Sequence, residues 1–149
     1  MQKIFLLENN QATENIAAKL AINVYAPMNI YLEGELGTGK TTFVKGFLRG
    51  LSFEASVKSP TYTLVELYAV KDYTILHADL YRIKEVSALE EMGFRDYFNE
   101  KTIALIEWAS HAKNWLPKPD VLCALTFSAN AKGRLLSITA DQKIVEALC

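Results

Sequence analysis

With 149 residues, of which half are apolar, the chain is long enough for one well-formed hydrophobic core, so we expect a single domain over residues 1–149. Its 16 basic and 17 acidic residues give a formal charge of -1, which excludes a strong non-specific attraction to nucleic acid or to anionic membranes. Because the sequence shows no membrane-length apolar segment, no signal-type core and no CxxC pair, we expect a cytoplasmic protein without membrane contact.

The first third of the chain predicts strands alternating with helices. Residues 3–7 resemble a short strand, and residues 10–24 predict a helix whose first residue is the expected N-cap. Residues 29–33 have the β-branched and aromatic content of a buried strand, and residues 41–48 can continue as a helix with an apolar face. Residues 57–63 are expected to be extended, because the proline among them disfavours helix at the preceding residue.

The middle of the chain predicts a hairpin followed by helical segments. Residues 64–70 and 73–78 resemble two antiparallel strands around a short polar turn. Residues 86–92 predict a helical segment that Gly93 interrupts, and residues 94–98 resume it with a small aromatic cluster.

The last third predicts three more strands and a closing helix. Residues 102–106 form a short, almost wholly apolar strand. Strands are also predicted at residues 121–127 and 134–139, on either side of a polar turn at residues 129–133, and residues 142–148 predict a helix.

A phosphate-binding pattern lies between the strand at residues 29–33 and the helix that follows it. Gly34 to Thr41 reads Gly-Glu-Leu-Gly-Thr-Gly-Lys-Thr. The glycines let successive backbone N–H groups turn inward on a polyphosphate, because a Cβ would obstruct the curl or the close approach. Lys40 adds a cation for the outer phosphates, and the Thr41 hydroxyl is suited to Mg²⁺. The alternative is a glycine-rich turn without a ligand, but a strand, loop and helix in this order favour the phosphate site.

These elements predict an α/β fold. Apolar helices beside buried strands, together with a hairpin and extra strands, indicate a three-layer P-loop NTPase fold with a mixed parallel and antiparallel central sheet. The nucleotide is then expected at the carboxyl end of the strand that stops near Glu33.

Two acids follow predicted strands and are candidates for the chemistry of phosphoryl transfer. Glu107 comes directly after the apolar strand at residues 102–106, which is the position of a Walker B acid that holds magnesium or its waters. Asp79 follows the strand at residues 73–78 and can reach the metal shell or orient water. The alternative for either acid is that it caps the next helix.

Three further residues have both a functional and a structural interpretation. Thr61 lies in a polar stretch where a hydroxyl can sense the γ-phosphate or its magnesium, but the same residue suits an ordinary turn. His77 is a candidate proton carrier, although a lone histidine in a strand is more often a hydrogen-bonded structural group. Trp108 can shield the site or face a partner, and core packing is the competing interpretation.

Five motifs, spread over nearly the whole chain, together resemble the bacterial TsaE (YjeE) family. Their order and spacing, and the small size of the chain, are similar to that family, and the combination is far more specific than a phosphate loop alone. The motifs are residues 34–42, Lys58-Ser-Pro-Thr-Tyr-Thr-Leu-Val-Glu66, His77-Ala-Asp-Leu-Tyr-Arg82, Met92-Gly-Phe-Arg-Asp-Tyr-Phe98 and Glu107-Trp108.

The resemblance implies an ATPase of the machinery that makes threonylcarbamoyladenosine in tRNA. Its partners would be the TsaD and TsaB subunits of the transferase, with tRNA reached only indirectly through that complex. The cofactors would be ATP and Mg²⁺. The residues implied to wrap the phosphates of ATP are Gly37, Thr38, Gly39, Lys40, Thr41 and Thr42.

The resemblance also implies roles for residues outside the loop. Thr41 and Glu107 would be the magnesium ligands, and Asp79 would be the acid needed for hydrolysis. The expected catalytic residues are Asp79, Glu107, Lys40 and Thr61. Asn10 and Lys132 are expected around the nucleotide. The residues expected in switch or partner-facing segments are Thr61, Tyr81, Arg82 and Trp108.

Two other functions share the phosphate loop. A small-molecule kinase would need an acceptor pocket and an arginine-bearing lid that excludes water, and the few arginines of this chain form no clear lid. A nucleotide-dependent binding switch would bind partners without hydrolysis. Guanine preference is not expected, because the sequence has no Asn-Lys-x-Asp motif.

Overall fold

The structure is a computed structural model that describes residues 1–53, 56–130 and 132–149. Its strands are β1 (Gln2–Leu7), β2 (Met28–Glu33), β3 (Val65–Val70), β4 (Tyr73–Asp79), β5 (Thr102–Glu107), β6 (Val121–Phe127) and β7 (Arg134–Thr139). Its α-helices are α1 (Asn10–Ala21), α2 (Lys40–Gly50), α3 (Ser87–Glu91) and α4 (Gln142–Ala147), and its 3-10 helices are η1 (Phe94–Tyr97) and η2 (Ala109–Ala112).

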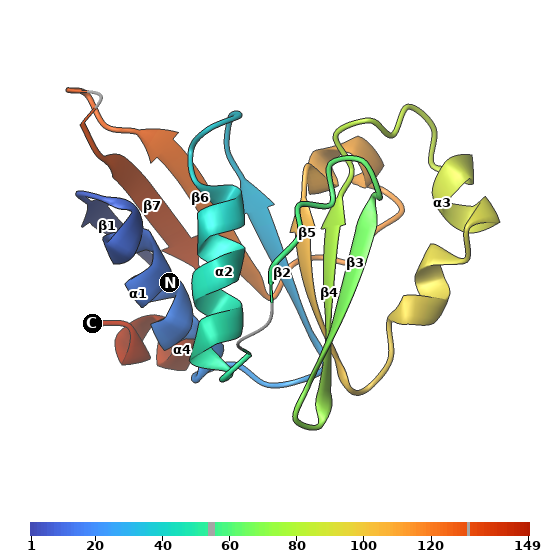
Figure 1. Cartoon of the computed structure of the whole chain (residues 1–149), viewed down its shortest axis with the longest axis horizontal. Helices are drawn as coiled ribbons and strands as arrows, with labels where there is room; N and C mark the ends of the chain where they lie inside the picture. The colour runs from blue at the N-terminus through green and yellow to red at the C-terminus, as the bar shows by residue number, and fades with distance from the viewer. Residues whose placement is uncertain (54–55, 131) are drawn as a thin grey trace.

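All seven strands form one mixed sheet in the order β1-β7-β6-β2-β5-β4-β3 (Figure 1). The central strands β6, β2, β5 and β4 run parallel to one another. At one edge β7 pairs antiparallel with both β6 and β1, and at the other edge β3 pairs antiparallel with β4. The predicted mixed sheet is therefore confirmed, as is the antiparallel β3–β4 hairpin.

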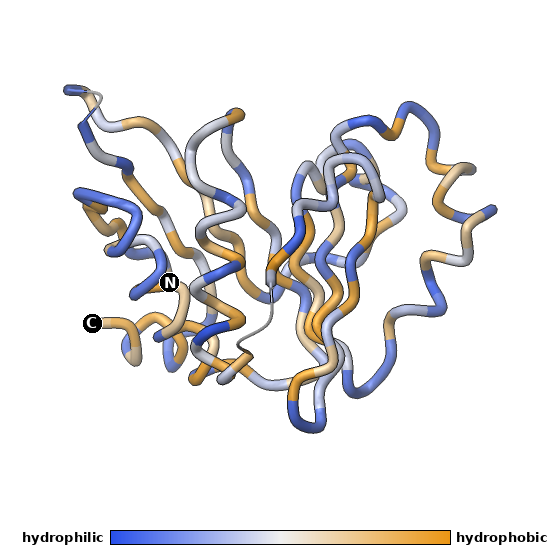
Figure 2. The backbone as a smooth tube through the Cα atoms, viewed as in Figure 1, coloured by the Kyte–Doolittle hydropathy of each residue, from blue (hydrophilic) through white to orange (hydrophobic). Residues whose placement is uncertain are grey.

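The two faces of the sheet bury two separate apolar clusters because successive side chains of a strand point to opposite faces. On one face, Ile30 and Leu105 pack with Phe43 and Phe47 of α2 and with residues of α1 and α4. On the other face, Ile106 and its neighbours pack with α3, η1 and η2. Figure 2 shows hydrophobic residues concentrated along the strands, with hydrophilic residues in the connecting loops.

Several boundaries differ from the sequence-based expectations. The N-cap of α1 is Asn9, whose side chain accepts a hydrogen bond from the backbone N–H of Ala12 at 2.8 Å, and not the following asparagine. The helix ends at Ala21, three residues early. The short η2 was not predicted, because one turn of helix carries no apolar period. Residue 131, within the predicted turn at residues 129–133, lies outside the described residues.

Helices α1 and α2 pack against each other at a point where only glycine fits. A Cβ on Gly46 would lie 2.4 Å from both Cα and the carbonyl oxygen of Glu14, and both are backbone atoms that cannot rotate away. This close approach fixes how α2, the helix that follows the phosphate loop, packs against α1. No helix among residues 1–53, 56–130 and 132–149 is both long and apolar enough to cross a membrane.

We expect Gly46→Ala to destabilise the protein by about 1–3 kcal/mol, the usual cost of forcing extra atoms into a packed interior. Helix propensity alone would favour alanine by about 1 kcal/mol, so the sign of the change separates the two effects. Urea unfolding measures the change in the free energy of unfolding. The control is Lys45→Ala, an exposed position on the same helix, which should stay within about 0.5 kcal/mol of wild type. A more stable Gly46→Ala protein would contradict the packing argument.

Candidate active site around the phosphate loop

The phosphate loop joins the end of β2 to the start of α2. Gly37 and Gly39 adopt φ angles of +81° and +105°, which side-chain-bearing residues rarely adopt. A Cβ at either position would meet nothing within 4 Å, so backbone conformation, and not crowding within the chain, requires glycine there. No side chain caps α2, so the N–H groups of its first turn remain available to an anion at the helix start.

The Lys40 ammonium is buried against the loop that it would serve. Its Nζ donates hydrogen bonds to the carbonyl oxygens of Gly34 and Glu35, the latter at 3.3 Å. It also lies 5.0 Å from the centroid of the Trp108 ring, within the range of a cation–π interaction. The cation is therefore fixed at the mouth of the loop by two carbonyl dipoles and an aromatic face.

The two candidate acids lie next to each other on neighbouring strands. Asp79 on β4 is directly opposite Glu107 on β5 in the parallel register. Glu107 is buried and makes a 2.6 Å hydrogen bond to His77, whereas Asp79 is half-buried and accepts a 3.0 Å hydrogen bond from the backbone N–H of Tyr81. Burial raises the pKa of the Asp79 carboxyl above its ordinary value, the Tyr81 hydrogen bond opposes this, and the charge of Glu107 adds to it.

A cavity of about 400 Å³ brings most of the predicted site residues together. Nine of them line it: Asn10, Gly37, Gly39, Lys40, Thr41, Thr42, Thr61, Asp79 and Glu107. Residues from the N-terminus of α1, the phosphate loop, the segment before β3, and the ends of β4 and β5 thus meet at one place. Trp108 also lines the cavity.

Two of the residues predicted to bind the nucleotide are not part of this cavity. Lys132 lines a separate small pocket with residues such as Leu6 and Glu8, and no residue of the phosphate loop lines that pocket. The Thr38 side chain is buried and donates a 2.8 Å hydrogen bond to the carbonyl oxygen of Glu35, so it closes the loop internally.

Sequence reasoning missed Arg134, the basic residue that does line the cavity. Its guanidinium donates a 3.2 Å hydrogen bond to the carbonyl oxygen of Gly37 and lies 4.5 Å from the ring centroid of Phe127, the residue opposite it across the β6–β7 pair. The sequence did predict Arg134 as the first residue of a strand. A position in a strand fixes the direction of a side chain better than a position in a turn does.

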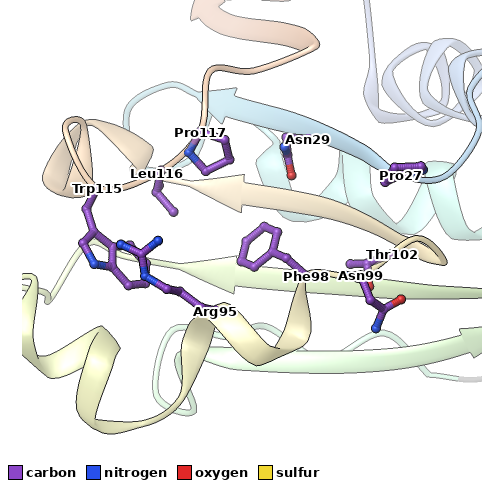
Figure 3. A pocket seen from close by; sticks show the side chains of 9 residues that line it. All are labelled: Pro27, Asn29, Arg95, Phe98, Asn99, Thr102, Trp115, Leu116 and Pro117. Carbon is purple, nitrogen blue, oxygen red and sulfur yellow. Dashed lines mark hydrogen bonds between the residues drawn. The ribbon is translucent and has the colours of Figure 1, made fainter.

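A larger cavity of about 550 Å³ lies elsewhere, near the starts of β2 and β5 (Figure 3). Its walls include Phe98, Trp115 and Leu116, and its charged side chain, Arg95, stacks at 4.3 Å on the Trp115 ring. Among the described residues that line it there is no carboxylate to hold a metal ion and no glycine loop. The chemistry of phosphate binding therefore points to the smaller cavity.

Comparison with known proteins identifies the family. The family model of the threonylcarbamoyl adenosine biosynthesis protein TsaE matches residues 7–136. The chain belongs to the TsaE family. This result confirms the resemblance seen in the motifs.

Individual TsaE relatives are similar over most of the chain. The tRNA threonylcarbamoyladenosine biosynthesis protein TsaE of Haemophilus influenzae is 43% identical over 113 residues, which cover 76% of this chain and 72% of that protein. The protein of the same name from Bacillus subtilis is 34% identical over 142 residues, covering 95% and 87%. The crystal structure of Bacillus subtilis YdiB superposes with a TM-score of 0.80 at 28% identity, covering 100% of this chain and 92% of that one, and supports the predicted α/β P-loop NTPase fold.

The raised pKa of Asp79 in this TsaE-family chain predicts a pH-dependent effect on stability. The folded protein holds the Asp79 proton more tightly than the unfolded chain does. The free energy of unfolding therefore falls as the pH rises from the ordinary aspartate pKa of about 4 through the raised pKa of the folded state. We therefore expect Asp79→Asn, which keeps an acceptor for Tyr81, to melt at a higher temperature than wild type at pH 7, with a smaller difference at pH 4. Thermal unfolding at both pH values measures this.

The control is Asp72→Asn in the exposed β3–β4 turn, which should change the melting temperature equally little at both pH values. An Asp79→Asn gain that is the same at pH 4 and pH 7 would show that charge burial is not its cause.

Proposed function

We propose that this protein is a Mg²⁺-dependent ATPase that serves tRNA threonylcarbamoyladenosine biosynthesis. The observation that carries the proposal is the convergence of one ammonium group, one threonine hydroxyl and two carboxylates around a glycine loop in a single cavity. The comparisons support the pathway, since the relatives named above carry that function in their names.

The residues of the cavity fit a magnesium–nucleotide complex. The free N–H groups at the start of α2 and the Lys40 ammonium would bind the phosphates. Thr41 and Glu107 would supply oxygen ligands to Mg²⁺. Within the described residues there is no group of three or more acidic, histidine or cysteine side chains that could hold a metal alone, which agrees with an ion bound through one or two protein oxygens, substrate phosphates and water.

Hydrolysis requires a group that orients the attacking water, and Asp79 suits this role better than Glu107. One Glu107 oxygen is engaged by His77, whereas Asp79 is half-buried at the cavity and its hydrogen bond to Tyr81 occupies only Oδ1. The raised pKa of Asp79 also makes it a more effective proton acceptor than an aspartate with the ordinary pKa. Bound Mg²⁺ would neutralise charge that develops on the phosphates, and Arg134 would add a second cation near Gly37.

The proposed partners are the TsaD and TsaB subunits of the threonylcarbamoyl transferase, with tRNA contacted only through them. Beside the cavity, the chain presents exposed aromatic surface: Tyr62 is 85% exposed and Tyr81 47% exposed. Such side chains are enriched at protein interfaces. With a formal charge of -1, the chain has no general affinity for RNA. The free thiols Cys123 and Cys149 fit a cytoplasmic location.

Loss of the Lys40 ammonium should abolish support of the pathway. We expect cells depleted of the protein and supplied with Lys40→Ala to lose threonylcarbamoyladenosine from tRNA, because the phosphates lose their cation. Lys45→Ala, which removes an exposed lysine from the same helix, should restore the modification fully. Mass spectrometry of digested tRNA measures the nucleoside. Unchanged levels after depletion over many generations would contradict the proposal.

Removal of the Asp79 carboxylate should stop turnover and spare nucleotide binding. We expect Asp79→Ala to lower ATP hydrolysis in the presence of purified TsaD and TsaB by about 100-fold or more, since a positioned acid or base commonly supplies a factor of 10²–10⁴. Phosphate release and fluorescent-nucleotide binding are measured in parallel. Full activity in Asp79→Ala would reject its role. Binding without turnover in wild type would indicate a switch, and phosphorylation of an added nucleoside or sugar would indicate a kinase.

A further inference from the structure

His77 is fully buried on β4 and contacts one of the proposed magnesium ligands. Its side chain has 0% exposure, and its Nε2 lies 2.6 Å from Oε2 of Glu107 on the neighbouring strand. His77 does not line the cavity, although Glu107 does. The imidazole therefore stands behind the carboxylate and has no contact with the space where a nucleotide would lie.

The chemistry of this contact fixes the tautomer of the ring. An ionised carboxylate only accepts hydrogen bonds, so the hydrogen lies on Nε2 of His77 and is donated to Glu107. The other ring nitrogen, Nδ1, is buried and has no partner among the described residues. Nδ1 without a partner is tolerated more easily as a lone pair than as an N–H group, which agrees with the hydrogen lying on Nε2.

This buried ring is poorly explained by packing or by proton transfer. An apolar side chain would fill the same space without leaving a polar nitrogen unpaired. A proton carrier would need a path to the cavity, and the enclosed ring does not line it. The contact that His77 makes is with Glu107.

We propose that His77 is a positioning residue that holds the Glu107 carboxylate in the orientation that binds Mg²⁺. The hydrogen bond engages Oε2 and leaves Oε1, which has no hydrogen bond among the described residues, as the oxygen for the metal or its water. The inference rests on the proposed function, because it assigns His77 to the magnesium site of that function.

Two amide variants separate hydrogen bonding from mere polarity. His77→Gln places an amide donor near the position of Nε2, whereas His77→Asn places it near Nδ1 and too far from Glu107 to bond. We expect His77→Asn to raise the Mg²⁺ concentration that half-saturates binding of N-methylanthraniloyl-ADP by about 10–100-fold, the usual loss when the partner of a metal ligand is removed. His77→Gln should stay within about threefold of wild type, and binding in EDTA should be unchanged in both.

Ile75→Val is the control for general loss of stability. It lies two residues earlier on β4, is equally buried and faces the same side of the sheet, but it packs with apolar neighbours. It should lower the melting temperature without changing the Mg²⁺ dependence. Folded His77→Asn with wild-type Mg²⁺ dependence would overturn the proposal. Wild type that shows no Mg²⁺-dependent nucleotide binding would instead overturn the proposed function itself.

A measurement on the wild-type chain tests the hydrogen bond without any variant. The chain has two histidines, and the second, His111, must carry its hydrogen on Nδ1, because that atom lies 2.9 Å from the carbonyl oxygen of Leu80. Imidazole ¹⁵N chemical shifts should therefore show opposite tautomers, with Nε2–H at His77 and Nδ1–H at His111. A ring of His77 that carries its hydrogen on Nδ1 would overturn the proposal, even if no variant folds.

Discussion

The register between the parallel strands β2, β5 and β4 is the constraint on which the site depends. Glu107 lies opposite Leu32 on one side, next to the start of the phosphate loop, and opposite Asp79 on the other. If β4 and β5 each shifted by one residue in the sheet, both carboxylates would turn to its other face, and Ala78 and Ile106 would take their places beside the loop. The hydrogen bonds of three strands therefore fix the spacing between the acids and the loop.

The same face of the sheet changes from apolar to polar along its strands. On β4, Ile75 packs beneath the helices, and His77 and Asp79 follow it on that face; on β5, Leu105 is followed by Glu107. Buried charges are costly unless they are paired, and here loop carbonyls satisfy Lys40 and an imidazole satisfies Glu107. The polar end of this face of the sheet lies at the cavity. The cost in stability of burying charged side chains is therefore confined to the place where those side chains can act.

The sequence was most informative where local chemistry decides the structure. The phosphate loop, the hairpin and the last two strands were predicted because glycine spacing, turn residues and β-branched content act over a few residues. That Arg134 lines the cavity, and Lys132 does not, could not be predicted, because it depends on how β6 pairs with β7. The partner of His77 could not be predicted either, since Glu107 lies 30 residues away and meets it only through strand register.

Trp108 connects the phosphate site to the molecular surface. It adopts φ +56° directly after β5, and its ring lies over the Lys40 ammonium and 5.0 Å from the ring of the exposed Tyr81. An anion in the cavity competes with the loop carbonyls for that ammonium, and any shift of the cation changes a cation–π contact worth about 0.5–2 kcal/mol. The position of an aromatic ring beside exposed surface is thus energetically linked to what the cavity holds.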